Sequence, residues 1–253
     1  MSGGALVLAV ELAGAGVAYA LGARRVRRWP AWRAACFAAG LAVVAFALLG
    51  LDAAAHRSLR GHMLQHLLLV FGAAPLLVLG SPVALALRAT GARGRRVLRL
   101  PALGHPAVGF AALAGTMAAT HLTGLYDAAL AHPVLHAAEH LAYLGAAALF
   151  WRPVIGADPV PGRPGPVGRL MYLMLASGPL SLVGVAMEGS HRAWYATYAS
   201  RPGALADQHA AGALMWVGGG LALAAITILA VWAALRREHA RQLEYERRLE
   251  AAA

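Results

Sequence analysis

Long runs of apolar residues divide the chain, and short polar connections separate them. The seven apolar segments cover residues 5–22, 34–51, 62–87, 106–126, 133–151, 170–188 and 210–235. Each has about the 17–25 residues that an α-helix needs to cross a hydrocarbon core of roughly 30 Å. The pattern therefore predicts an all-α integral membrane protein built as a bundle of seven transmembrane helices.

The composition supports the same class of protein. Of the 253 residues, 60% are hydrophobic and 13% are charged, whereas soluble domains carry roughly 45–50% apolar and about 25% charged residues. All 22 basic residues are arginine, and the lack of lysine excludes a retinal Schiff base or a catalytic lysine. The single cysteine, Cys36, excludes a disulfide within the chain and a CxxC metal or redox site.

The arginines predict how the chain sits in the membrane. Eighteen of them lie in alternate connections or in the C-terminal tail, and four lie in the remaining connections. By the positive-inside rule, the N-terminus lies outside and the C-terminus lies in the cytoplasm. The net charge of +11 thus reflects topology, and we expect no nucleic-acid partner. We also expect no cleavable signal peptide, because basic residues follow the first apolar segment and none precedes it.

The charge pattern also predicts where the membrane domain ends. We expect residues 1–235 to form the seven-helix domain and residues 236–253 to form a charged, helical, cytoplasmic tail. In that tail Glu244 precedes Arg248 by four residues, a spacing that supports a helix. Small residues recur at helix-packing spacing from Gly14 onwards, which permits a homodimer without requiring one.

Histidines carry the clearest chemical signal. Nine of the eleven map to the predicted outer end of the bundle: His56, His62, His66, His121, His132, His136, His140, His191 and His209. His62 and His66 are four residues apart, as are His136 and His140, so each pair shares one helix face. Imidazole suits copper, zinc, iron or nickel, and thioether sulfur favours Cu(I). We therefore predict a metal site of His62, His66, His136 and His140, with His121 as a fifth candidate.

Acidic residues at the same end allow other chemistry. Glu139 stands beside His140 and is expected to orient a ligand or to act as a base. Residues 136–140 read H-x-x-E-H, the pattern of a zinc hydrolase in which two histidines hold zinc and the glutamate activates water. That alternative needs a third ligand, for which Glu188 is a candidate. A second alternative is a haem-binding electron carrier with His66 and His140 as axial ligands.

Three groups of residues, in order along the chain, resemble one protein family. They are HMLQH at 62–66 with GSP at 80–82; HP at 132–133 with HxxEH at 136–140, FW at 150–151 and DP at 158–159; and DQ at 207–208 with MW at 215–216. Together they resemble the polytopic CtaG family, the assembly proteins of caa3-type cytochrome c oxidase, over about residues 5–235.

This resemblance implies a multi-pass protein of the bacterial plasma membrane that acts without catalysis. Such a protein helps to mature a haem–copper oxidase by supporting copper delivery to its catalytic subunit, and a copper donor protein outside the cytoplasm is a further expected partner. Copper, favoured as Cu(I), is the expected metal, and zinc is the alternative. The resemblance carries function onto the four paired histidines and, in support, onto Asp207 and Gln208; Met63 lies within the first group and is also expected to support the site.

Overall fold

The computed structural model describes residues 3–97, 105–158 and 163–251, and every regular element among them is helical. Arg99, which counts toward the predicted basic side, and Pro159, which belongs to the second group of family residues, lie outside the described residues. The elements are α1 (Gly3–Arg25), α2 (Ala31–Ala45), η1 (Phe46–Gly50), α3 (Asp52–Arg57), α4 (Leu59–Leu67), η2 (Leu68–Ala73), α5 (Ala74–Leu79), α6 (Pro82–Val97), α7 (Pro106–His121), α8 (Leu125–Ala131), α9 (Pro133–Ile155), α10 (Pro166–Glu188), α11 (Ala196–Ala199), α12 (Ala204–Ala213), η4 (Leu214–Gly218) and α13 (Gly219–Glu250).

Helices cover most of each of the seven predicted segments, so the all-helical prediction is confirmed. Segment 62–87 is interrupted at Gly80–Ser81, and segment 106–126 is interrupted at residues 122–124. Five runs are long and apolar enough to cross a membrane: Gly4–Arg25, Ala31–Gly50, Leu59–Gly91, Pro166–Glu188 and Ala204–Glu250. Helices α7 and α8 would make a sixth if they count as one span bent by 74°.

Helix α9 is long enough to span but does not join this set among the described residues. Its polar residues, among them His136, Glu139, His140 and Arg152, lower its mean hydropathy. The count of seven spans and the orientation of the termini therefore stay predictions.

Helix α9 is the centre of the packing. It contacts α5, α7, α8 and the π-helical stretch η2. Trp151 and Phe150 lie buried in the largest apolar cluster, together with Val70 and Leu173, and the Trp151 indole N–H donates to the Val70 carbonyl at 2.7 Å. These contacts hold α9 against the run α4–η2–α5, so the histidine-bearing faces of both elements meet.

Close helix approach depends on glycine at two places. A Cβ on Gly109 of α7 would lie 2.5 Å from the Leu149 carbonyl oxygen of α9. A Cβ on Gly212 of α12 would lie 2.5 Å from the Gly184 carbonyl oxygen of α10. Small residues are expected where helices pack closely in membranes; the first contact brings α7 to α9, and the second brings α12 to α10.

Three π-helical stretches occur among the described residues, and two of them continue helices that carry the site. η2 follows α4 and precedes Pro75, which has no backbone N–H to continue an α-helical ladder. η4 follows α12 and contacts α4. Such stretches in helices are rare and frequently lie at functional sites.

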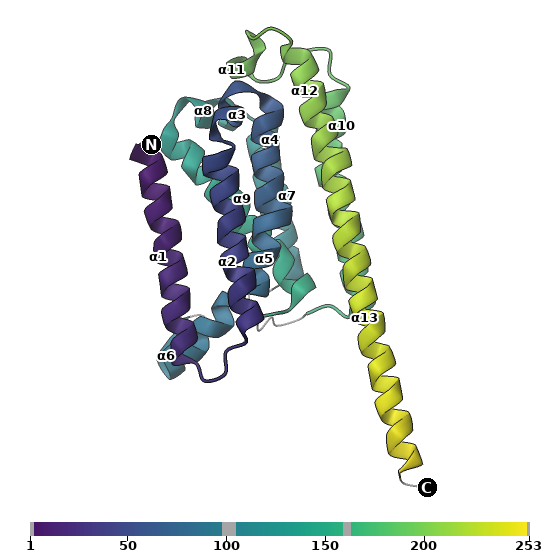
Figure 1. Cartoon of the computed structure of the whole chain (residues 1–253). Helices are drawn as coiled ribbons and strands as arrows, with labels where there is room; N and C mark the ends of the chain where they lie inside the picture. The colour runs from purple at the N-terminus through teal and green to yellow at the C-terminus, as the bar shows by residue number, and fades with distance from the viewer. Residues whose placement is uncertain (1–2, 98–104, 159–162, 252–253) are drawn as a thin grey trace.

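The two ends of the bundle differ. The N-terminus lies at the same end as the short helices α3, α8 and α11, whereas α6 and the C-terminus lie at the opposite end (Figure 1). Residues 236–250 continue α13 as a helix that projects beyond the bundle, and Arg248 pairs there with Glu244. Termini at opposite ends are what an odd number of crossings produces.

The predicted orientation can be tested with cysteine labelling in a Cys36→Ala background. Leu122 is exposed between α7 and α8, and Tyr245 is exposed near the end of α13. If the N-terminus lies outside, a membrane-impermeant maleimide added to intact cells labels Leu122→Cys and reaches Tyr245→Cys only after permeabilisation. The reverse labelling pattern would contradict the predicted orientation.

Candidate metal centre

Helix α4 presents two buried imidazoles on one face. Ser58 begins the helix by accepting a hydrogen bond from the Gly61 N–H at 3.2 Å. One turn on, His62 is 0% exposed and His66 is 5% exposed. Their Nε2 atoms lie 3.0 Å apart, close to the separation of two nitrogen ligands that each bind one metal ion at about 2.0–2.1 Å.

Helix α9 supplies the facing groups. It begins with Pro133 at its first turn, and Pro is favoured there because its missing N–H has no helical partner. Glu139 and His140 are buried, and His136 is half-buried. Glu139 Oε2 lies 3.8 Å from His62 Nε2, and Glu139 Oε1 lies 3.9 Å from His66 Nε2.

These residues form two overlapping sets of possible metal ligands among the described residues. One set is His62, His136 and His140, and the other is His62, His66 and Glu139; within each set the ligand atoms lie within 4.8 Å of one another. We call the five residues together the His/Glu cluster. His62 belongs to both sets, so the two positions for an ion share one ligand.

The donor atoms of the cluster fit a metal ion. Buried polar atoms normally have hydrogen-bond partners, and leaving them without partners costs free energy. Several buried atoms of the cluster have no hydrogen-bond partner: His62 Nδ1, His66 Nδ1, His136 Nε2, His140 Nε2 and both carboxylate oxygens of Glu139. A cation bound among them would satisfy the carboxylate and the imidazole nitrogens that face one another.

Histidine side chains become more buried from the end of the bundle that carries α3 toward the cluster. The His56 side chain on α3 is 62% exposed, and its ring centroid lies 6.2 Å from that of His136. The His136 ring in turn lies 5.0 Å from that of His62 and 4.4 Å from that of His140. His136 is thus the member of the cluster nearest to the surface.

Aromatic side chains that the sequence interpretation missed enclose the cluster. The Tyr143 ring stacks on His66 at 4.1 Å, and the Tyr126 ring lies 4.9 Å from His62. Both tyrosines are buried. The signal for Tyr143 was present, because it lies three residues after His140 and so continues the same face of α9. Tyr126 comes from α8, and no local spacing connects it to the histidines.

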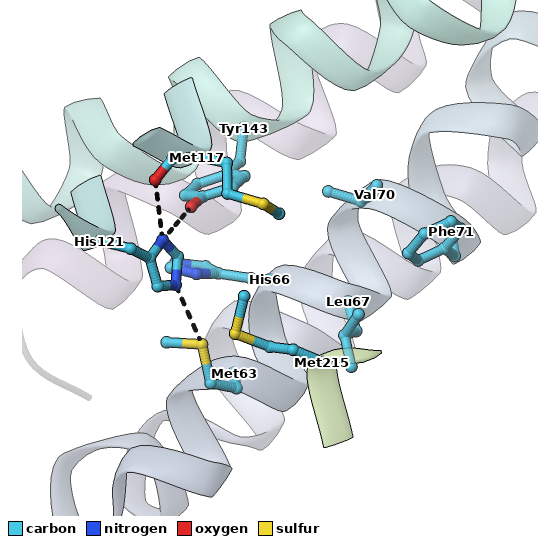
Figure 2. Close-up of a pocket in the computed structure, with 9 residues that line it drawn as sticks. All are labelled: Met63, His66, Leu67, Val70, Phe71, Met117, His121, Tyr143 and Met215. Atoms are coloured by element: carbon cyan, nitrogen blue, oxygen red, sulfur yellow. Dashed lines mark hydrogen bonds between the residues drawn. The ribbon is translucent and has the colours of Figure 1, made fainter. Parts of the chain in front are cut away.

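His121 and Met63 lie beside the cluster rather than in it. The His121 ring centroid is 6.4 Å from that of His66, and His121 belongs to neither ligand set. Its Nε2 faces Met63 Sδ at 3.4 Å. Figure 2 shows both side chains lining a small cavity that His66 also borders.

Asp207 and Gln208 hold the surroundings of the cluster in place. Asp207 Oδ2 accepts the Leu59 N–H at 2.6 Å, and Oδ1 lies 3.4 Å from Arg60 Nε, so α12 anchors the start of α4. Gln208 Oε1 accepts the Trp194 N–H at 2.6 Å, and its Nε2 donates to a backbone carbonyl of α10. Neither residue belongs to a ligand set.

Glu188 was expected as a third zinc ligand in the hydrolase alternative. In the structure its carboxylate accepts the indole N–H of Trp216, and it belongs to neither ligand set. That contact ties the end of α10 to η4 and leaves the third-ligand role of Glu188 without structural support.

Comparison with known proteins decides the family. The model of the cytochrome c oxidase caa3 assembly factor family matches residues 17–237. The chain belongs to this family. The resemblance predicted from the three groups of residues is thereby confirmed.

Curated relatives of this caa3 assembly factor family member occur in mycobacteria. Uncharacterized proteins of Mycobacterium leprae, Mycobacterium bovis and Mycobacterium tuberculosis are each 28% identical to it over 251 residues. The matches cover 88–89% of this chain but only 37–38% of the relatives, so the chain spans less than two fifths of their length. No solved structure matches the chain.

A small cavity lies beside the cluster. Its volume is about 20 Å³, which is enough for a water molecule or an ion. His66 borders this cavity, and the His66 and His140 ring centroids lie 5.6 Å apart.

The contact of Asp207 with α4 predicts a difference in stability. Asp207→Ala removes the acceptor of the Leu59 N–H, and hydrogen bonds to charged groups contribute about 1.5–3 kcal/mol. We expect a loss of that order in the free energy of unfolding, measured by denaturant titration in detergent. Asp52→Ala is the control, because the Asp52 carboxylate is exposed and pairs with exposed His56. Equal effects of the two variants would contradict the anchoring role.

Proposed function

We propose that this protein receives copper at its outer end, holds it in the His/Glu cluster and passes it to the catalytic subunit of a caa3-type cytochrome c oxidase. The observation that carries the proposal is the convergence of four imidazoles and one carboxylate. Each imidazole has one buried nitrogen without a hydrogen-bond partner, and both carboxylate oxygens also lack one. Membership of the oxidase assembly family supplies the recipient. The proposed location is the bacterial plasma membrane, and the proposed source is a copper donor protein outside the cytoplasm.

Copper is the cargo that this donor set suits when the recipient is a haem–copper oxidase. Imidazole binds copper well, and Cu(I) tolerates the low coordination numbers that three histidines provide. The same imidazoles also bind zinc. Copper is the metal that we propose because the proposed recipient is a haem–copper oxidase. In this reading Glu139 balances the charge of the ion and orients the imidazoles, and no reaction of a substrate is catalysed.

The overlap of the two ligand sets suggests how an ion moves. An ion that enters past His136 binds first among His62, His136 and His140. It then exchanges two histidines for His66 and Glu139 while His62 stays bound. Stepwise exchange keeps the ion bound to protein ligands throughout. An ion without ligands inside the apolar bundle would cost several kcal/mol or more in desolvation free energy.

Metal content tests the proposal directly. Full-length protein purified in detergent is incubated with copper under reducing conditions, washed and analysed for elements. We expect copper to remain bound to the wild type and to be lost from His62→Ala/His136→Ala, which removes a ligand from both sets.

The control for this test is His132→Ala/His191→Ala, which removes two exposed histidines of the same end. This variant should keep its copper. Equal copper in all three proteins would overturn the proposal, and zinc retained in preference to copper would favour the hydrolase.

The Glu139→Gln variant distinguishes the copper-delivery proposal from the zinc-hydrolase alternative. A zinc hydrolase that uses Glu139 as its base would keep its metal and lose all activity in cells. Under the delivery proposal the amide oxygen can still bind an ion. Oxidase activity of membranes from cells that carry Glu139→Gln should therefore fall modestly, and that from cells with His136→Ala should fall strongly. Complete loss with Glu139→Gln at unchanged metal content would contradict delivery.

A further inference from the structure

A second group of soft donor atoms lies beside the His/Glu cluster. A cavity of about 20 Å³ lies between α4, α7, α9 and η4 and is bordered by Met63, His66, Met117, His121, Tyr143 and Met215 (Figure 2). We call it the methionine cavity. Three of the seven methionines of the chain meet here from three different elements, and all three are buried.

Three oxygen atoms surround Nδ1 of His121. The Met117 carbonyl oxygen lies at 3.0 Å, and the Thr120 and Tyr143 hydroxyl oxygens lie at 2.9 and 3.2 Å. The carbonyl oxygen can only accept, and the two hydroxyls can also bond to each other, at 2.6 Å. In the tautomer whose Nδ1–H donates to Met117, Nε2 has no proton and carries a lone pair.

That lone pair faces a second electron-pair donor. Met63 Sδ lies 3.4 Å from His121 Nε2, and a thioether sulfur has no hydrogen to donate. Two lone pairs that face each other are not a hydrogen bond, but they are what a metal ion needs from two ligands. A histidine that binds a metal commonly donates its other N–H to a backbone carbonyl, as His121 does to Met117 in this tautomer.

The side chains of Met117 and Met215 border the same cavity. Figure 2 draws both side chains at the wall of the cavity, on different sides of His66 and His121. The rest of the lining is apolar, with Leu67, Val70 and Phe71. Methionine does fill gaps in ordinary cores, but here three methionines from three elements border one small cavity together with His121, whose Nε2 faces one of the sulfurs.

We propose that the methionine cavity binds Cu(I) through His121 Nε2 and Met63 Sδ, with the thioethers of Met117 and Met215 completing the ligand set. Thioether sulfur selects Cu(I) over Zn(II) and other harder ions. A space of about 20 Å³ admits an ion without its hydration shell, because it holds about one water molecule. The cavity thus favours an ion that is both soft and readily dehydrated.

Because the cavity lies next to the His/Glu cluster, it would bind the same ion after the cluster has released it. The order of these two steps rests on the proposed function. His66 contributes Nε2 to the His/Glu cluster, where it lies 3.0 Å from His62 Nε2, and its ring also borders the cavity. An ion held by His62, His66 and Glu139 therefore has the thioethers as its neighbours on the other side of His66. The cluster accepts several metals, and the cavity passes on only Cu(I).

The test compares Cu(I) binding by the full-length wild type with that by Met63→Leu/Met117→Leu/Met215→Leu. Leucine keeps the volume and apolar character of methionine, so folding should be retained. We expect Cu(I) bound by the wild type to show sulfur as well as nitrogen neighbours by X-ray absorption at the copper edge. The triple variant should lose the sulfur neighbours and one of about two bound Cu(I) ions, while Zn(II) binding stays unchanged.

Met187→Leu is the matched control. Met187 is buried like the other three but does not line the cavity, so this variant should match the wild type in copper number and in sulfur neighbours. A thermal melt of each variant checks that the fold is retained. Sulfur neighbours and copper number unchanged in the triple variant would overturn the proposal.

The two proposals fail in different ways. Loss of copper in His62→Ala/His136→Ala without any change in the triple methionine variant would support the His/Glu cluster as a copper site and contradict copper binding in the methionine cavity. Loss of sulfur-bound copper in the triple methionine variant, with full retention of the nitrogen-bound copper in the histidine variant, would keep the cavity and remove the cluster as the proposed receiving site.

Discussion

The packing of the run α4–η2–α5 against α9 is the contact on which the site depends. Helix α9 packs on η2 and α5, and the side chains of α4 and α9 then place three buried imidazoles, a half-buried one and a buried carboxylate together, where unpaired polar groups are costly. The apolar cluster around Trp151, the Trp151–Val70 hydrogen bond and the glycine contact of α7 with α9 supply the packing that holds these groups together. The bundle thus holds together a set of donor atoms that a bound cation would satisfy.

Local geometry explains what the sequence could predict. The helices follow from the length of the apolar runs, and the shared faces of His62 with His66 and of His136 with His140 follow from the helical repeat. The acidic neighbour Glu139 was expected to orient a ligand or to act as a base, and its carboxylate oxygens lie 3.8 and 3.9 Å from the Nε2 atoms of His62 and His66. The sequence alone does not predict this proximity because it depends on the rotation of α9 relative to α4.

Contacts between distant helices account for the remaining differences. His121 was a fifth candidate ligand beside the four paired histidines, and the structure places its Nε2 3.4 Å from Met63 Sδ, with its ring centroid 6.4 Å from that of His66. Asp207 and Glu188 engage a helix start and an indole instead of the cluster. Such contacts depend on how distant helices pack across the bundle. The spacing of residues within a single helix does not predict them.

Together these features make up the proposed path for one ion. His56 and His136 lead from the exposed end to His62, which belongs to both ligand sets, and His66 borders both the cluster and the methionine cavity. Along this path the donors change from imidazole and carboxylate to imidazole and thioether, so preference for Cu(I) increases with depth. The ion remains coordinated by protein atoms at each proposed step.

Copper transfer in vitro tests the central claim most directly. Wild-type protein loaded with Cu(I) is mixed with copper-free caa3-type oxidase in the presence of a chelator that removes free copper, and the gain in oxidase activity is followed. The account predicts that loaded wild type activates the oxidase and that His62→Ala/His136→Ala, treated in the same way, does not. Equal activation by both proteins, or none by the loaded wild type, would contradict it.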